Sequence, residues 1–399
     1  MNASTKDPVV ITGLSRTPMG GFQGALSSQT ASQLGAVAIK SALERSGLAS
    51  EEIEEVIMGN VLPAGQGQAP ARQAALGAGL PLSSNCTTIN KMCGSGMKAT
   101  MLAHDLIMAN SNQIMVAGGM ESMSNAPYLL PKVREGLRMG HSQVKDHMFL
   151  DGLEDAYEPG KLMGSFAELC ADKYQFSRQQ QDEFAITSLQ RAIHATEQGF
   201  FKEEIAPVSI ETRKQSLVVE QDEQPFNANI EKIPGLRPAF KADGTVTAAN
   251  ASSISDGAAA LVLMKKSTAE SKGLTPIATI LGHVSHAQEP AWFTTAPVAA
   301  IDKMMQKVSW QTSDVDLFEI NEAFAVVTMA AMTELALPHD RVNIHGGACA
   351  LGHPIGASGA RILVTLIHAL KRNGLSRGIA SLCIGGGEAT AMAVELCGS

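Results

Sequence analysis

Residues 90–96 read Asn-Lys-Met-Cys-Gly-Ser-Gly, and they open the segment that decides the fold. The run 97–109 that follows places apolar residues at the period of a helix. It leads into Gln-Ile-Met-Val-Ala-Gly-Gly at residues 113–119, which we interpret as a buried strand stopped by its glycines. The segment therefore predicts a turn, a helix and a strand, with Cys93 where the helix begins.

The second half of the chain repeats this order. A glycine-rich stretch at 346–354 contains His353 and precedes an expected helix at 360–370. A strand-like run then carries Cys383 and is followed by three glycines. Further strands are expected at residues 9–12, 55–59, 277–284 and 316–320, and further helices at 34–43 and 298–308. All α/β proteins repeat such units, but four elements in one order favour an internal duplication into two βαβ-type halves around a shared interface.

Residues 121–250 differ in composition from both halves. They carry more charge, and they predict an amphipathic helix at 178–198 and extended stretches at 208–211 and 217–219. We interpret them as an inserted loop domain, which separates an N-terminal half at residues 1–120, completed by about residues 251–272, from a C-terminal half at 273–399. Part of the insert is basic, at Lys132, Arg134, Arg138 and Lys145. This stretch could be a solvated loop or a site that binds an anion.

Composition and charge exclude several classes of protein. The chain of 399 residues is long enough for two or three domains. A net charge of −8 argues against nucleic acid as a partner, because phosphate binding needs clustered positive charge. No apolar run approaches the roughly 20 residues of a membrane span, and we expect no secretory signal. The six widely spaced cysteines are typical of reduced thiols in a cytoplasmic protein.

Cys93 and His353 are candidates for nucleophilic chemistry. At the start of a helix, backbone N–H groups and the helix dipole are expected to lower the pKa of the Cys93 thiol. Gly94 and Gly96 would let a substrate carbonyl approach the backbone. The alternative for Cys93 is an inert buried thiol. His353 lies between a glycine and a proline, in a turn from which it could serve as a base or as a donor to an oxyanion.

Cys383 and Asn321 are the other candidates. The three glycines after Cys383 can present N–H groups to an oxyanion, and its thiol can act as a second acid or base. Asn321 follows an expected strand, where it could orient a water or a carbonyl or could form an Asx turn.

A metal site among His345, Cys349 and His353 is not expected. Their spacing of four would place them on one face of a helix, but the glycines and the proline of this stretch make a continuous helix improbable. The chain also has no Cys-x-x-Cys pair to complete a zinc site.

Four motifs together resemble those of the thiolase family, and within it the short-chain enzymes that transfer acetyl groups between acetyl-CoA molecules. The motifs are Asn-Lys-Met-Cys-Gly-Ser-Gly at 90–96, Asn-Glu-Ala-Phe at 321–324, Gly-His-Pro-Ile-Gly-Ala-Ser-Gly at 352–359 and Cys-Ile-Gly-Gly-Gly at 383–387. The resemblance covers essentially the whole chain. It implies the thiolase fold, an α/β architecture in which the two halves form a five-layered αβαβα core.

The resemblance also implies the roles of the site residues. Cys93 would be the nucleophile that accepts the acyl group, His353 would activate it, and Cys383 would move the α-proton of the second acyl group. Asn321, through a water, and His353 would form one oxyanion hole. The N–H groups of Cys93 and Gly385 would form the other. Among binding residues, Ser252 would contact the pantetheine arm of coenzyme A, and the acyl pocket would be narrowed or lined by Met163, Phe324, Ala323 and Leu153.

The reaction implied is a reversible ping-pong Claisen condensation of two acetyl-CoA to acetoacetyl-CoA and CoA. A broader-range 3-ketoacyl-CoA thiolase of fatty-acid β-oxidation is the alternative. Relatives of this type are homotetramers built as dimers of dimers, and they require no cofactor beyond their coenzyme A thioester substrates. Whether a monovalent cation binds is left open.

Overall fold

The computed structural model describes residues 7–211 and 216–398. The strands of the N-terminal half are β1 (Val9–Arg16), β2 (Gly20–Gly21), β3 (Glu55–Gly59), β4 (Asn85–Ile89), β5 (Ile114–Ser122) and β10 (Ser255–Lys265). Its helices are α1 (Ala31–Ser46), α2 (Pro70–Gly77), α3 (Ser95–Met108) and α7 (Lys266–Ser271). Helix α1 begins at a capping box, in which Thr30 and Gln33 each accept the other's backbone N–H.

The C-terminal half has the strands β11 (Ala278–Ala287), β12 (Leu317–Ile320), β13 (Arg377–Ile384) and β14 (Glu388–Leu396). Its helices are α8 (Ala296–Val308), α9 (Ala325–Glu334), α10 (Ala348–Leu351) and α11 (Ser358–Asn373). The strand order here is β11-β14-β13-β12, and the N-terminal half has the matching order β1-β10-β5-β3, with β4 added at the edge. Parallel and antiparallel pairings also match strand for strand, which agrees with the predicted duplication.

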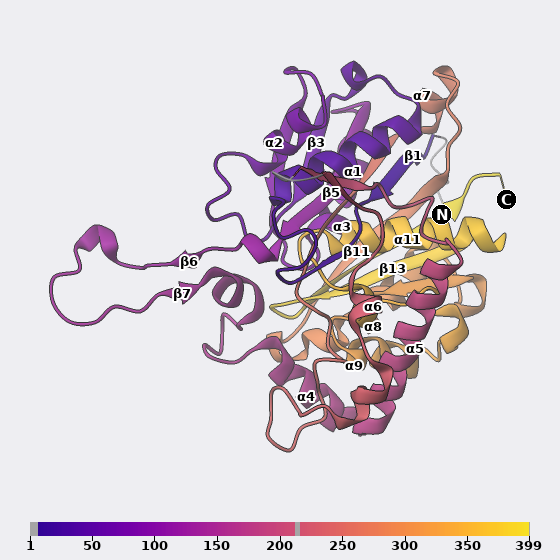
Figure 1. The fold of residues 1–399 in the computed structure, drawn as a ribbon. Coiled ribbons are helices and arrows are strands. Elements are labelled where there is room, and N and C mark those ends of the chain that lie inside the picture. Colours follow the sequence, from indigo (N-terminus) through magenta and orange to yellow (C-terminus); the bar gives the residue numbers. More distant parts are fainter. Residues whose placement is uncertain (1–6, 212–215, 399) are drawn as a thin grey trace.

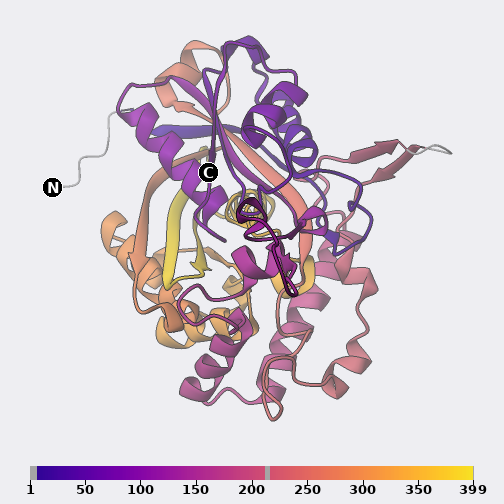
Figure 2. The same ribbon diagram turned by 90° about the vertical axis from the view of Figure 1, so that its left-hand side faces the viewer.

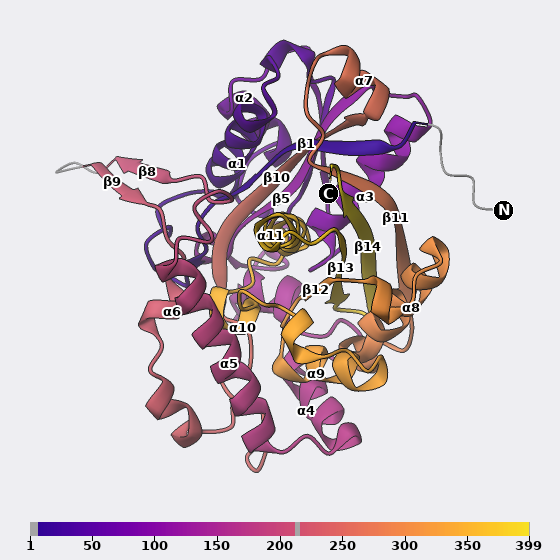
Figure 3. The same cartoon turned by 90° about the vertical axis from the view of Figure 1, so that its right-hand side faces the viewer.

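The elements form five layers, as the fold class predicted. Helices α1 and α2 cover the outer face of the N-terminal strands, and α8 covers the outer face of the C-terminal ones. Helices α3 and α11 lie between the two groups of strands, where α11 contacts β10 on one side and β13 on the other. Figure 3 looks along α11 and shows strands of both halves around it. The two groups join in one sheet only where Val10 and Ile11 of β1 pair with β11.

The prediction that the strand ending near residue 119 stops at its glycines was wrong. Strand β5 continues through Gly118 and Gly119 to Ser122. A Cβ at Gly118 would lie 2.0 Å from the Ala259 carbonyl oxygen, and one at Gly119 would lie 2.0 Å from that of Gly356. These glycines therefore allow the backbone of β5 to approach β10 and the loop after His353, and they do not end the strand.

The segment between the halves packs beside the core and also extends away from it. It contains β6 (Tyr128–Leu129), β7 (Lys145–Asp146), the π-helical turn Phe149–Leu153, α4 (Met163–Tyr174), α5 (Arg178–Glu197), β8 (Val208–Glu211), β9 (Ser216–Val219) and α6 (Gln224–Asn227). The loop between β6 and β7 projects far from the molecule in Figure 1, and Figure 2 views it end-on. The basic residues of the sequence analysis, Lys132, Arg134, Arg138 and Lys145, are exposed on this projection.

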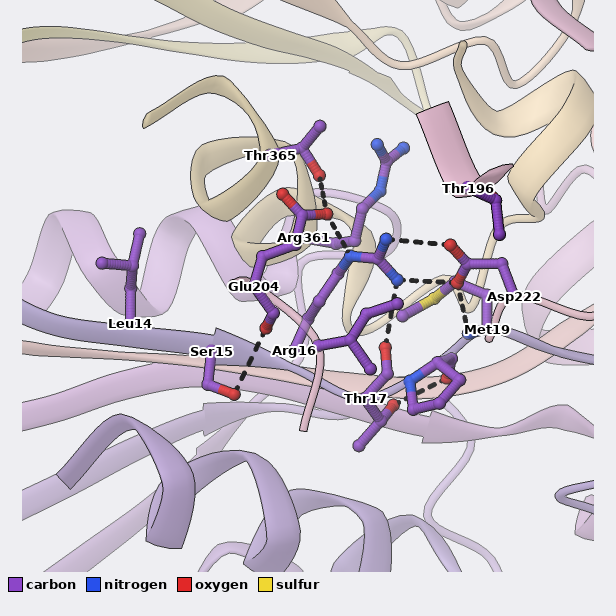
Figure 4. Close-up of polar contacts among 12 residues, drawn as sticks. Leu14, Ser15, Arg16, Thr17, Met19, Thr196, Glu204, Asp222, Arg361 and Thr365 are labelled. Carbon is purple, nitrogen blue, oxygen red and sulfur yellow. Dashed lines mark hydrogen bonds and ion pairs between the residues drawn. The ribbon is translucent and has the colours of Figure 1, made fainter. Parts of the chain in front are cut away.

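A buried ion-pair network ties this segment to the core (Figure 4). Arg16, at the end of β1, donates from Nε to Glu204 at 2.5 Å and from both Nη atoms to Asp222 at 2.6 and 2.9 Å. Thr365 of α11 donates to the same Glu204 carboxylate. Because a buried charge is costly without its partner, these contacts fix the insert against β1 and α11. None of the described helices has the length and apolar character needed to cross a membrane.

Candidate active site

One cavity brings the predicted site residues together. It has a volume of about 380 Å³ and lies where both halves meet the insert. Its walls include Cys93, His353, Cys383, Gly385, Ser252, Met163, Phe324, Ala323 and Leu153. Among the residues to which the sequence analysis gave a catalytic or substrate-binding role, Asn321 is the one that does not line it.

Cys93 lies in the turn before α3, where Met92 adopts a positive φ of 48°. Hydrogen bonding from the backbone N–H groups of Gly385 and of Cys93 itself acts to lower the pKa of its thiol. The expected lowering of the Cys93 pKa was nevertheless wrong, because burial raises the pKa to about 11 and outweighs these hydrogen bonds. The thiol is therefore protonated at neutral pH and needs a base to become a nucleophile.

His353 is held as a neutral imidazole that can act as this base. Its Nδ1 lies 2.6 Å from the Ser358 hydroxyl, which donates to the Pro354 carbonyl at 2.9 Å. The Nδ1–H therefore donates to Ser358, and the lone pair of Nε2 is free. Nε2 is buried with no hydrogen-bond partner in the described part of the chain. Burial, assisted by the Arg361 charge, lowers the pKa of His353 to about 3, so the ring is neutral.

Cys383 is the second thiol of the cavity. It lies near the end of β13 and is 1% exposed. Burial, and the charge that Cys93 can carry, raise the pKa of Cys383 well above its usual value. The next turn contains Gly386 and Gly387 at φ values of 92° and 87°, and this turn brings Gly385 N–H toward the Cys93 sulfur.

Asn321 lies behind His353, away from the cavity wall. Its Nδ2 is 3.4 Å from His353 Nδ1, and its Oδ1 accepts a long hydrogen bond of 3.5 Å from Arg361. The side chain is thus buried between the catalytic loop and α11, and any contact with substrate would have to be indirect.

Apolar side chains from the insert and from the loop before α9 line the cavity. Met163 begins α4, and Phe324 immediately precedes α9. The Phe324 ring packs edge-on against Phe240, with ring centroids 6.1 Å apart. The backbone N–H of Ser252 donates to the Ala323 carbonyl at 3.0 Å, which ties these two lining segments together.

Sequence reasoning missed several apolar residues of this cavity. They are Met92, Phe149, Phe240, Phe293, Ile254 and Ile355. Met92 and Ile355 belong to motifs already singled out, so their neighbours could have identified them. Phe240 belongs to no motif, and only the packing of the insert brings it to the site.

His345 and Cys349 have other surroundings. The His345 ring packs against Phe200, with centroids 5.2 Å apart. The backbone N–H of Cys349 donates to Glu322 at 3.1 Å. Helix α10 spans a single turn, so His345, Cys349 and His353 do not share a helix face.

A cysteine and a histidine in the turns before the two central helices, with a second cysteine from the strand after α11, define a thiolase-type site on a duplicated fold. Two family models agree: the thiolase N-terminal domain matches residues 9–267 and the thiolase C-terminal domain matches residues 274–396. The chain belongs to the thiolase family.

Similar proteins match over their whole length. The chain is 51% identical to acetyl-CoA acetyltransferase 2 of Arabidopsis thaliana over 97% of both chains. It is 48% identical to a cytosolic acetyl-CoA acetyltransferase of Gibberella zeae over 97% of this chain and 98% of the other. Among solved structures, the Acat5 thiolase of Ascaris suum in complex with coenzyme A is 44% identical and superposes with a TM-score of 0.93, over 98% of this chain and 100% of that chain.

Proposed function

We propose that this protein is an acetyl-CoA C-acetyltransferase, which condenses two acetyl-CoA to acetoacetyl-CoA and CoA and also runs the reverse reaction. The observation that carries the proposal is the meeting in one cavity of two thiols, Cys93 and Cys383, beside the unpartnered Nε2 of His353. Relatives named acetyl-CoA acetyltransferase, similar over their full length, support the same activity.

The first half-reaction transfers an acetyl group to Cys93. His353 Nε2 accepts the thiol proton as the sulfur attacks the carbonyl of acetyl-CoA. The carbonyl oxygen becomes an oxyanion that the N–H groups of Cys93 and Gly385 stabilise. When the bond to the coenzyme A sulfur breaks, the proton on Nε2 passes to that sulfur, and CoA leaves as a thiol. His353 is then neutral again.

The second half-reaction forms the carbon–carbon bond. The Cys383 thiol gives its proton to His353 Nε2, and the resulting thiolate takes an α-proton from a second acetyl-CoA. The enolate oxygen is held by the Nε2–H of His353 and by a water on Asn321. The enolate carbon attacks the acetyl thioester and releases acetoacetyl-CoA and the Cys93 thiolate, which then takes the proton from His353 Nε2. In this step His353 donates from Nε2 while its Nδ1–H still donates to Ser358.

Mass spectrometry after exposure to acetyl-CoA tests these roles. We expect an acetyl adduct on Cys93 in the wild-type protein and in Cys383→Ser, and none in Cys93→Ser. Cys383→Ser should keep acylation but lose condensation. An adduct on another cysteine, or loss of acylation in Cys383→Ser, would contradict the division of roles.

The bulky side chains of Met163, Phe324 and Phe240 line the cavity and leave less room for a long acyl chain. We expect thiolysis of C4 ketoacyl-CoA to be far faster than thiolysis of C10. The variant Met163→Ala, which shortens one lining side chain, should reduce the difference between the C4 and C10 rates. Equal rates on both substrates in the wild-type protein would favour a broad-range 3-ketoacyl-CoA thiolase.

We also propose a homotetramer, a dimer of dimers. Strand β4 pairs only with β3 among the described residues, so one of its edges is open to a second chain. The projecting loop exposes apolar side chains, including Met139 at 99% exposure. Light scattering during size exclusion measures the assembly; a monomer at micromolar concentration would contradict it.

The compartment and the cofactor requirement complete the proposal. All six cysteines are unpaired, which with the cytosolic relative supports a cytoplasmic location. The reaction steps use only side chains and backbone N–H groups, so no cofactor is required, and full activity after dialysis against a chelator is expected. Rates in potassium and sodium buffers of equal ionic strength would reveal a monovalent cation effect.

A further inference from the structure

A cluster of three potential metal ligands lies outside the catalytic cavity. His104 and Asp105 come from the last turns of α3, and His283 comes from β11. His283 Nε2 lies 3.2 Å from His104 Nδ1 and 2.9 Å from Asp105 Oδ1, and His104 Nδ1 lies 3.1 Å from the same oxygen. The three atoms thus form a nearly equilateral triangle.

No placement of protons turns all three of these contacts into hydrogen bonds. If both ring nitrogens carry a proton, each can donate to Asp105, but the two N–H groups then oppose each other across 3.2 Å. If only one of the two ring nitrogens carries a proton, the lone pair of the other nitrogen faces the Asp105 carboxylate, and at least one of the three contacts has no hydrogen between its atoms. A cation placed above the triangle would use a lone pair from each atom at once.

We propose that His104, Asp105 and His283 bind a divalent transition-metal ion of the zinc type. Bonds of about 2.0–2.2 Å place neighbouring ligand atoms roughly 2.8–3.1 Å apart at octahedral angles and roughly 3.3–3.6 Å apart at tetrahedral angles. The three observed separations of 2.9, 3.1 and 3.2 Å lie at or close to the octahedral range without rearrangement. Two imidazole nitrogens and one carboxylate oxygen are also the donors that such ions prefer.

The surroundings of the cluster leave room for further ligands and place one cation nearby. Asp105 is 55% exposed on its side chain, so water can fill the remaining coordination positions. Lys307, which donates to the His283 carbonyl at 2.9 Å, is a nearby cation that opposes binding.

The position of the cluster indicates a structural role. His104 lies eleven residues beyond Cys93, and ten residues of helix span about 15 Å, so the ion would not touch the reacting groups. It would instead join α3 of the N-terminal half to β11 of the C-terminal half (Figure 2 shows α3 at the side of the molecule). An ion bound only by the folded protein stabilises that fold by mass action.

Equilibrium dialysis of the chelator-treated full-length protein against Zn²⁺, followed by elemental analysis, tests the site. We expect one ion per chain, and at least a roughly ten-fold loss of affinity in His104→Gln and in His283→Gln. Cys93→Ser, which removes the reactive thiol, and His286→Gln, three residues along the same strand, should bind as the wild type does. Unchanged binding in both cluster variants, or loss in Cys93→Ser, would overturn the proposal.

Spectra and melting temperatures provide readouts that do not depend on catalysis. Co²⁺ in place of Zn²⁺ should give a visible absorption band in the wild type that is absent in His283→Gln. Zn²⁺ should raise the melting temperature of the wild type by a few degrees and leave that of His283→Gln unchanged. Acetyltransferase activity of His283→Gln without metal confirms that it is folded. A melting temperature that responds equally in both proteins would contradict a specific site.

Discussion

The two halves have the same strand order, yet their paired glycines differ in purpose. In β5, Gly118 and Gly119 stay in the strand and let two other backbones approach closely. In the matching strand β13, pairing ends at Ile384, and Gly386 and Gly387 form a turn with positive φ. The first pair therefore serves close approach alone, whereas both glycines of the second pair need a positive φ. Gly387 also needs space, because an added Cβ would lie 2.3 Å from the Gln288 carbonyl oxygen, but Gly386 is free of close neighbours.

The turns before the two central helices, α3 and α11, also occupy matching positions but carry different functional side chains. The turn before α3 carries the thiol Cys93, and the turn before α11 carries His353 as its base. The duplicated scaffold places these two turns at one cavity, so a single active site needs both copies. Duplication here supplied two equivalent positions, and different side chains made them complementary.

His353→Gln should produce the largest effect, because it removes the base contributed by the second half. Glutamine is similar in size but cannot accept a proton, so we expect acylation of Cys93 to slow by about 100- to 10,000-fold. Rapid quenching with mass spectrometry measures the rate. His345→Gln, in the same loop but packed on Phe200, is the control and should acylate at the normal rate. A normal rate in His353→Gln would assign the base elsewhere.

Gly119→Ala should have the next largest effect, which is on stability. The new Cβ would lie 2.0 Å from the Gly356 carbonyl oxygen and 2.9 Å from the Ala357 Cα, so backbone must move. We expect a loss of about 3 kcal/mol or more in the free energy of unfolding, measured by urea denaturation. Gly235→Ala, where an added Cβ meets nothing within 4 Å, should be nearly neutral.

His368→Gln should change how stability depends on pH. Burial lowers the pKa of His368 in the folded protein to about 3 from 6.5. Between these values the unfolded chain binds one more proton, so the wild type loses about 1.4 kcal/mol of this contribution for each unit that pH falls. His368→Gln has no imidazole to protonate and should not show this loss of stability. Free energies of unfolding at pH 6.5, 5.5 and 4.5 measure the loss in each protein. Parallel curves of stability against pH for the two proteins would contradict a neutral His368.

Gly386→Ala should have the smallest effect. The space around Gly386 is open, with Tyr157 atoms 3.9 Å or more from an added Cβ, so only the positive φ of 92° opposes alanine. We expect a loss of about 1 kcal/mol. A loss as large as that of Gly119→Ala would mean that Gly386 also serves close packing, and the contrast between Gly386 and Gly119 would fail.

Local patterns predicted most of the elements because period and glycine content are local properties. The strand at 55–59 matches β3 residue for residue. What failed depended on neighbours distant in the chain. Gly119 faces a loop more than 230 residues away, and the burial that raises the pKa of Cys93 is produced by the whole fold. Likewise, no pattern brings His104 within 3.2 Å of His283, which is 179 residues distant.

The interaction between the two thiols limits the cavity to one negative sulfur at a time. Two thiolates so close in a buried cavity repel each other, so the charge on Cys93 makes Cys383 harder to ionise. Cys93 is protonated in the free protein and acetylated when the second half-reaction begins, so it is left with a charge only when condensation releases it as a thiolate. At that moment Cys383 holds the α-proton and is neutral, so the two sulfurs are never charged together.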